Sequence, residues 1–249
     1  TPGQDQSASK QPDARGPKHW NEFVLCSQNA DELFMPDSKA AEKLRGMGFT
    51  TALVIPQKGI FRGTSALFDL GEGTPNDLVV KPHVAQHVTF ENSGGDAYPN
   101  SLIGTIALIR QTLLDAQWYR SAMQASAKYP AEPRPEFVGD LAALEDALTA
   151  KQPVMFESTD ELSILRAARI GKEFSLKLMI RGSGTEYRRL EAVKQTGLPI
   201  ILPVNFPDAP TVQSPEEALN AGLEELRYWD DAPDNPKKLL DAGITFAFT

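Results

Sequence analysis

The chain has 249 residues, which is enough for one large α/β domain or two small ones. Its composition, 41% hydrophobic and 23% charged, is ordinary for a globular protein, and its net charge of −8 argues against nucleic acid or an anionic membrane as the main partner. No apolar run approaches the roughly 20 residues that span a bilayer, so we expect no membrane span. Cys26 is the single cysteine, which excludes an internal disulfide.

The N-terminal stretch differs in composition from the rest of the chain. Residues 1–18 are rich in Gln, Ser, Pro, Asp and Lys, and their only hydrophobic residues are Ala8 and Ala14. Such a stretch cannot bury enough apolar surface to become ordered. We therefore predict a flexible tail or a long loop over residues 1–18 and a single domain over residues 19–249. The tail also lacks the apolar core of a signal peptide.

Helix and strand signals begin after the tail. Asp37–Gly46 predicts a helix that is capped by Asp37 or Ser38. Phe49–Pro56, with its Thr, Val and Ile residues, predicts a buried strand. Gln57–Gly63 is then expected to be a loop at the end of that strand.

The middle of the chain predicts one extended segment and two helices. Leu78–Phe90 alternates loosely and is predicted to be extended, with a turn at Asn92–Gly95. Ser101–Ala127 carries apolar residues at helical spacing, begins with a residue suited to an N-cap and is followed by three prolines. Asp140–Thr149 predicts the second helix.

From residue 153 the sequence reads strand, loop and helix three times, and a last strand follows at Ile244–Thr249. The apolar runs are short and lack polar alternation, which is typical of strands buried on both faces of a parallel sheet. These runs are Val154–Phe156, Leu176–Ile180 and Leu198–Val204. Because the sequence stops inside a strand, we expect a missing segment or a second chain to complete the sheet.

Polar residues predict where the helices between these strands begin. Ser158 and Glu161 fit a capping box, Thr185 fits an N-cap, and Ser214 with Glu217 fits a second capping box. The apolar side of the helix after Ser214 is predicted to face the core. That side consists of Leu219, Leu223, Leu226 and Trp229.

The residues just past the three strands are Glu157, Arg181 and Asn205. Sites in α/β proteins are built at the carboxyl ends of parallel strands, so we treat Glu157 and Arg181 as catalytic candidates and Asn205 as a substrate-binding candidate. Neighbouring strands lie about 5 Å apart, so Glu157 and Arg181 could instead form a structural salt bridge. Glu157 is also a candidate base or metal ligand.

Arg62 is the single charged residue between Gly59 and Gly63. A guanidinium in a loop at the end of a strand is suited to bind the carboxylate of a substrate. The alternative is a hinge whose arginine pairs with Asp69 or Glu72.

Two further features could hold a ligand. His83 and His87 are four residues apart and would share one face of a helix or of a strand, which makes them weak candidates for metal ligands. The backbone of Gly182–Gly184, between a strand and a helix, could hold an anion, although the run lacks a complete phosphate-binding motif. In the alternative interpretation, these are ordinary histidines and an ordinary tight turn.

Several longer motifs carry a family resemblance. The stretch KLRGMGFTTALVIP resembles the helix and second barrel strand of the amidohydrolase superfamily, in particular its imidazolonepropionase-like or prolidase-like branch. The stretch PVMFESTDELSILRAARIGKEFSLKLMIRGSGTEYRRLEAVKQTGLPIILP resembles the region from strand 5 to strand 7, and LLDAGITFAFT resembles the approach to strand 8. GIFRGTSAL and YPNSLIGTIALIRQTLLDAQWY resemble one subgroup of secreted bacterial members, which implies a periplasmic or secreted location.

The resemblance implies a partial (β/α)8 TIM-type barrel that contains roughly strands 2 to 8 of the family fold. It also implies hydrolysis of C–N bonds by a metal-activated water. The family's metal ligands are an HxH motif on strand 1, histidines on strands 5 and 6, and an Asp on strand 8. Here Glu157 and Arg181 occupy the strand 5 and strand 6 positions, and the other two ligand positions would lie before Thr1 and after Thr249.

Three functions are consistent with these features. In the first, the parent protein is a metal-dependent hydrolase of amide, peptide or cyclic amide bonds. Its zinc or other divalent metal would be held outside this chain, and its substrate would be a small molecule or a peptide. In the second, the chain is a catalytically inactive amidohydrolase-like module that serves as a scaffold or binding partner. In the third, it is an open, doubly wound domain that binds an anion at Gly182–Gly184.

Overall fold

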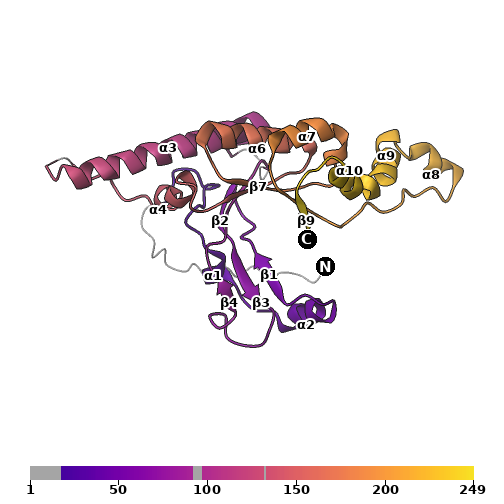
Figure 1. Cartoon of the computed structure of the whole chain (residues 1–249), viewed down its shortest axis with the longest axis horizontal. Coiled ribbons are helices and arrows are strands. Elements are labelled where there is room, and N and C mark those ends of the chain that lie inside the picture. Colours follow the sequence, from indigo (N-terminus) through magenta and orange to yellow (C-terminus); the bar gives the residue numbers. More distant parts are fainter. Residues whose placement is uncertain (1–17, 92–96, 132) are drawn as a thin grey trace.

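A six-stranded sheet forms the centre of this computed structural model, which describes residues 18–91, 97–131 and 133–249 (Figure 1). In the order in which they pair, its strands are β2 (Phe61–Thr64), β5 (Gln86–Thr89), β6 (Val154–Glu157), β7 (Leu178–Arg181), β8 (Ile200–Leu202) and β9 (Phe246–Phe248). The β2 strand is antiparallel to β5, and all other neighbours are parallel. The predicted parallel strands are therefore confirmed. The predicted tail, apart from Lys18, and the predicted turn at Asn92–Gly95 lie outside the described residues.

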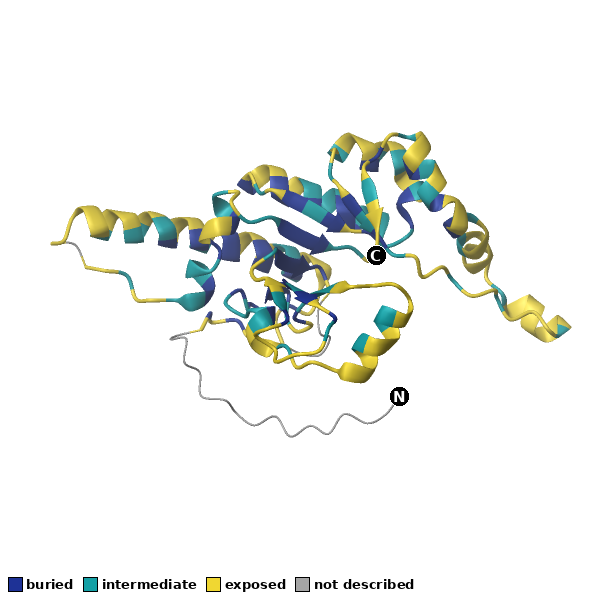
Figure 2. Ribbon diagram, turned by 60° about the horizontal axis from the view of Figure 1, so that its bottom comes forward, coloured by how far each residue is buried: buried dark blue, intermediate teal, exposed yellow. Residues whose placement is uncertain are grey.

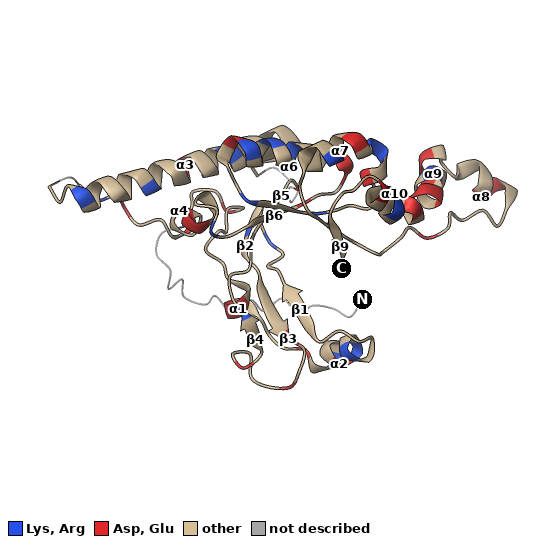
Figure 3. Ribbon diagram, viewed as in Figure 1, with Lys and Arg blue, Asp and Glu red and all other residues tan. Residues whose placement is uncertain are grey.

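Helices cover one face of this sheet (Figure 1). They are α3 (Leu102–Lys128), α4 (Gly139–Ala142), α5 (Glu145–Leu148), α6 (Glu161–Phe174), α7 (Leu190–Thr196) and α10 (Asn235–Asp241), with the 3-10 turns η1 (Glu186–Arg189) and η2 (Ala232–Asp234) between them. Apolar side chains of the strands and of the helices form one core cluster, which includes Val154, Phe156 and Ile180. Charged residues gather on α6 and α7, whose outer side faces away from this sheet (Figure 3).

The burial of the strands differs in part from the prediction. The β6 residues Val154, Met155 and Phe156 are all buried, as expected for a strand covered on both faces. In β7 and β8, by contrast, buried residues alternate with half-buried ones, such as Met179 and Ile201. The face of these strands that lies away from the helices is therefore only partly covered by the described residues.

A second, smaller sheet projects away from the helices (Figure 1). It consists of β1 (Thr51–Val54), β3 (Ala66–Asp69) and β4 (Val79–Lys81), all antiparallel, and the short helices α1 (Ala30–Leu33) and α2 (Ser38–Gly46) accompany it. The prediction of a buried barrel strand at Phe49–Pro56 is wrong, because β1 pairs with β3 outside the main sheet and is at most half-buried. This sheet has its own small core, which contains Phe68 and Leu78.

The helix starts follow the sequence signals in part. Ser101 caps α3 by accepting a hydrogen bond from the Gly104 N–H, and the capping box of Ser214 and Glu217 opens α8 (Pro215–Asn220). The proposed cap at Ser158 is wrong: Asp160 caps α6, and the Ser158 hydroxyl donates to the Arg181 carbonyl oxygen at 2.6 Å.

The helix predicted after Ser214 is divided, and its apolar side is exposed. Gly222 is extended and separates α8 from α9 (Leu223–Asp231), and the two helices extend beyond the edge of the sheet (Figures 1 and 2). Leu219 is 87% exposed and Leu223 is 63% exposed, so the predicted core-facing side does not reach the core of the described residues.

The chain is thus a mixed α/β protein with a mainly parallel sheet. The predicted barrel is not closed within the described residues, since β2 and β9 form the two edges of the sheet. In the part of the chain that the structure describes, no helix has the length and apolar character needed to cross a membrane.

The core cluster gives a first test of this fold. Ile180 is fully buried in β7, whereas Ile103 on α3 is 82% exposed. We expect Ile180→Ala to lower the free energy of unfolding by about 2–5 kcal/mol, because it removes buried methyl groups and leaves a cavity. The control Ile103→Ala should change it by about 0.5 kcal/mol or less. Urea unfolding followed by circular dichroism measures both, and equal effects would contradict the packing described here.

Candidate functional site

A polar cleft of about 400 Å³ lies at the carboxyl ends of β5, β6, β7 and β8. The four residues singled out at the strand ends, Arg62, Glu157, Arg181 and Asn205, all line it. Further lining residues are Gln57, Thr89, Glu91, Ser158, Thr159, Gly182, Ser183 and Pro203. The structure thus brings the predicted site residues together, and their roles toward a ligand stay predictions.

The register of the sheet explains why these side chains converge. Thr89, Glu157 and Arg181 are direct neighbours across β5, β6 and β7. Successive side chains of a strand point to opposite faces. Because Phe156 and Ile180 pack in the core under the helices, Glu157 and Arg181 point to the other face.

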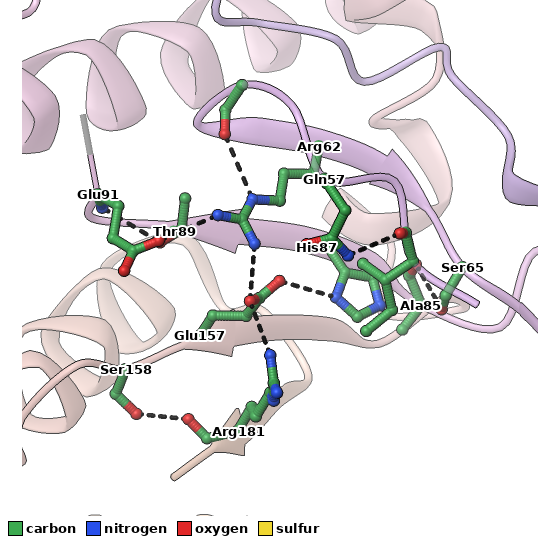
Figure 4. A network of polar contacts seen from close by, with 12 residues as sticks. Gln57, Arg62, Ser65, Ala85, His87, Thr89, Glu91, Glu157, Ser158 and Arg181 are labelled. Carbon is green, nitrogen blue, oxygen red and sulfur yellow. Dashed lines mark hydrogen bonds and ion pairs between the residues drawn. The ribbon is translucent and has the colours of Figure 1, made fainter. Parts of the chain in front are cut away.

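Glu157 lies at the centre of this cluster (Figure 4). Its Oε2 atom accepts hydrogen bonds from Arg62 Nη1 at 2.7 Å and from Arg181 Nη1 at 3.2 Å. Its Oε1 atom lies 3.7 Å from His87 Nδ1, which is too long for a hydrogen bond but short enough for electrostatic attraction if the imidazole is protonated. Burial by itself raises the pKa of the Glu157 carboxyl, but His87, Arg62 and Arg181 together lower it below its ordinary value. The predicted salt bridge between Glu157 and Arg181 is confirmed.

Arg62 is fixed by contacts within the protein. It lies in β2, so the prediction of a loop over Gln57–Gly63 is wrong at its C-terminal end. Its Nη1 donates to Glu157, its Nη2 donates to Glu91 at 3.1 Å and its Nε donates to the Gly59 carbonyl oxygen at 3.4 Å. The alternative partners Asp69 and Glu72 are therefore wrong.

Sequence reasoning missed Glu91 as a member of this cluster. It follows β5 by two residues, and its backbone N–H donates to the Thr89 hydroxyl at 3.1 Å. The rule that selected Glu157 and Arg181 would have selected Glu91 as well, had β5 been recognised as a strand of the main sheet. Leu78–Phe90 was predicted to be extended, but its loose alternation did not indicate that β5 joins the main sheet.

The two candidate histidines do not form a pair. His87 is completely buried in β5, whereas His83 is exposed, precedes the strand and has a positive φ of 50°. His83 lines a separate cavity, together with Phe137 and Gln152. The expectation of two histidines on one face is wrong, because the backbone between them is not regular.

The turn at Gly182–Gly184 already contains an anion, which is the side chain of Glu186. Its Oε1 accepts hydrogen bonds from the backbone N–H groups of Ser183 at 2.7 Å and of Gly184 at 3.2 Å, and its Oε2 accepts one from the Asn235 side chain at 2.7 Å. Glu186 is fully buried. The proposed free anion site is therefore occupied by the chain itself, and Thr185 makes no side-chain cap. A glutamate two residues after the turn was the signal that could have predicted this contact.

The cleft does not have the ligands that a divalent metal requires. Within residues 18–91, 97–131 and 133–249, no group of three or more His, Cys, Asp and Glu side chains is arranged to hold a metal ion. The Oε2 atom of Glu157 accepts hydrogen bonds from the guanidinium groups of Arg62 and Arg181. Their positive charge opposes the binding of a cation. Cys26 is buried, and burial raises the pKa of its thiol. The residues present therefore do not fit a metal centre.

The fold resembles that of a known amidohydrolase. The crystal structure of an amidohydrolase from Thermotoga maritima MSB8 superposes with a TM-score of 0.74 at 19% sequence identity. The match covers 92% of this chain and 58% of that chain, so the chain spans a little over half of that amidohydrolase. No protein-family model matches the sequence, and comparison with curated proteins gives no match. At this identity the similarity shows the fold.

The lowered pKa of Glu157 predicts a pH dependence of stability. A carboxylate whose pKa is lower in the folded state contributes stability above its unfolded pKa, and this contribution is lost as the pH falls through the folded pKa. Glu157→Gln should thus lower the free energy of unfolding by about 3 kcal/mol at pH 7, because it removes the shorter ion pair of the buried Arg62 and leaves it with the more exposed Glu91. The difference in the free energy of unfolding between this variant and the unsubstituted chain should shrink below about pH 4.

The exposed pair of Arg110 and Glu173 provides the control. Glu173→Gln should cost about 0–1 kcal/mol at pH 7. Urea titrations between pH 3 and pH 8 measure both variants. A cost for Glu157→Gln that does not change with pH would mean that the charge of Glu157 does not stabilise the fold.

Replacing Glu186 is also expected to lower the stability of the fold. In Glu186→Gln the amide oxygen can still accept from the turn, but the new NH2 group then faces the NH2 group of Asn235. We expect a loss of about 1–3 kcal/mol, because one buried donor is left without a partner. Glu191→Gln on the exposed surface of α7 is the control, with about 0.5 kcal/mol or less. Equal melting temperatures for the two variants would contradict the structural role of Glu186.

Proposed function

We propose that the chain forms part of an amidohydrolase-like barrel and that its own cleft binds a small ligand without a metal ion. In this proposal, the remaining strands of the barrel come from a further segment or from a second chain. The observation that supports it best is the position of Glu157, which is held between Arg62 and Arg181. Both guanidinium groups donate to the same oxygen atom of Glu157, and their positive charge disfavours a metal ion or an added proton on this carboxylate.

Because these ion pairs are buried, disrupting them lowers the stability of the fold. The side chains of Arg62 and Glu157 are only 10% and 12% exposed, so removing one partner leaves the other, away from water, with its longer ion pair alone. That remaining partner is Glu91 for Arg62 and Arg181 for Glu157. Arg181, at 48% exposed, contributes less to stability and is accessible to a ligand. We therefore assign Arg62 and Glu157 to the support of the cleft, and Arg181 and Asn205 to the binding of its ligand.

A second candidate function applies to the parent protein. The similarity to the Thermotoga amidohydrolase, together with the 58% of that chain that is covered, supports a longer protein that hydrolyses C–N bonds. Its metal ligands would lie outside this chain, which alone would be inactive. The imidazolonepropionase-like or prolidase-like branch and a periplasmic or secreted location remain part of this second proposal, on the motifs described above.

Metal analysis tests the first proposal directly. The chain and its Glu157→Gln variant are incubated with zinc and desalted, and their zinc content is measured by elemental mass spectrometry. Both should contain well below one zinc ion per molecule. Zinc should also leave the melting temperature unchanged, because a ligand stabilises a protein only when it binds the folded state.

The opposite result would be a stoichiometric metal ion that is lost in both Glu157→Gln and His87→Ala but retained in Glu173→Gln. It would assign Glu157 and His87 to a metal centre and refute the metal-independent cleft. For the parent protein, hydrolysis of peptide or cyclic amide substrates by the longer polypeptide, and not by this chain, would support the second candidate.

A further inference from the structure

The two arginines of the cleft differ in how many of their donors are used. Each of the three nitrogen atoms of the Arg62 guanidinium donates to an acceptor within the protein. The Arg181 guanidinium makes one such hydrogen bond, from Nη1 to Glu157, among the contacts of the described residues. Since the Arg181 side chain is 48% exposed, its Nε and Nη2 groups are available to a ligand in the cleft.

We propose that the ligand of this cleft is a small molecule with a carboxylate group, and that Arg181 binds this carboxylate. The inference rests on the proposed function, of which it specifies the ligand class. The planar guanidinium presents paired N–H donors at the spacing of the two carboxylate oxygens. Arg181 already contacts one carboxylate within the protein, through a single hydrogen bond from Nη1 to Glu157.

Two neutral side chains on the cleft wall can hold the rest of the ligand. Thr159 and Asn205 line the cleft, are exposed and have no hydrogen-bond partner within residues 18–91, 97–131 and 133–249. A hydroxyl group and a carboxamide both donate and accept hydrogen bonds, which suits a neutral polar group such as an amide. The volume of about 400 Å³ is near the lower end of ligand pockets, so the ligand is small.

The charge of the cleft favours a carboxylate over a phosphate. Two arginines, Arg62 and Arg181, stand against two glutamates, Glu91 and Glu157, so the charged side chains of the wall sum to zero. One added negative charge can be matched by the free side of Arg181, whereas a phosphate dianion would lie near two carboxylates. The backbone N–H groups that commonly bind phosphate at such a turn already donate to Glu186.

The experiment compares two probes of nearly equal size that differ in one group, a charged carboxylate in one and a neutral amide in the other. N-acetylglycine carries a carboxylate beside an amide, and N-acetylglycinamide replaces the carboxylate with a neutral amide. Titration of the full 249-residue chain, followed by NMR chemical shifts of the probe or by calorimetry, should show saturable binding of N-acetylglycine and binding of the amide that is at least about tenfold weaker. Inorganic phosphate, as a third probe, should bind more weakly than N-acetylglycine.

Variants on both sides of the ion pair make the test specific. Arg181→Met should weaken N-acetylglycine binding about tenfold or more, and Arg181→Lys should weaken it by less, since the charge remains but the paired donors are lost. Glu157→Gln should strengthen binding several-fold, because it removes the internal carboxylate that competes for Arg181. If Glu157→Gln only unfolded or loosened the cleft, it would weaken binding instead. Arg134→Met changes an exposed arginine outside the cleft and should leave binding unchanged.

Each other outcome overturns the inference. Equal binding of the two acetylglycine probes, or binding that is unaffected by Arg181→Met, would show that the carboxylate is not recognised by Arg181. Stronger binding of inorganic phosphate would replace the carboxylate with a phosphate ligand. These failures are distinct from a failure of the proposed function, which would appear as a stoichiometric metal ion bound through Glu157 and His87.

Discussion

Parallel pairing across β5, β6, β7 and β8 determines where the other parts of the structure lie. Parallel strands end at the same edge of the sheet, and their side chains alternate between its two faces. The face under the helices takes the apolar residues, such as Phe156 and Ile180. The other face receives the charged residues at the strand ends, so Glu157 and Arg181 meet although they are 24 residues apart in the sequence.

Charges that are brought together in this way must neutralise one another. Glu157 and Glu91 together balance the charges of Arg62 and Arg181. A metal centre at the same place would need neutral imidazoles and free carboxylates, as metal ligands require. This edge of the sheet therefore holds paired ions, in a fold that resembles that of the Thermotoga amidohydrolase.

Local signals in the sequence predicted the parallel units well. Short apolar runs, the Ser101 cap and the box of Ser214 with Glu217 depend on neighbouring residues, and the structure has all of them. The caps expected at Ser158 and Thr185 are local errors, whereas the misplaced strand and the misassigned partners of Arg62 involve residues that are distant in sequence. The hydrophobic pattern of Phe49–Pro56 fits a strand in either sheet, and only the pairing of β1 with β3 decides between them. Likewise, Arg62 contacts a carboxylate 95 residues away, which no local rule contains.

The carboxylate of Glu186 gives the turn after β7 a property that its backbone alone does not have. Turns of this shape often recruit an anion from solution, and their order then depends on the supply of that anion. Here the anion is attached to the chain, so its effective concentration at the turn is constant in any medium. A change of Glu186 to glycine or alanine would leave these two backbone N–H groups without the acceptor that the chain now supplies.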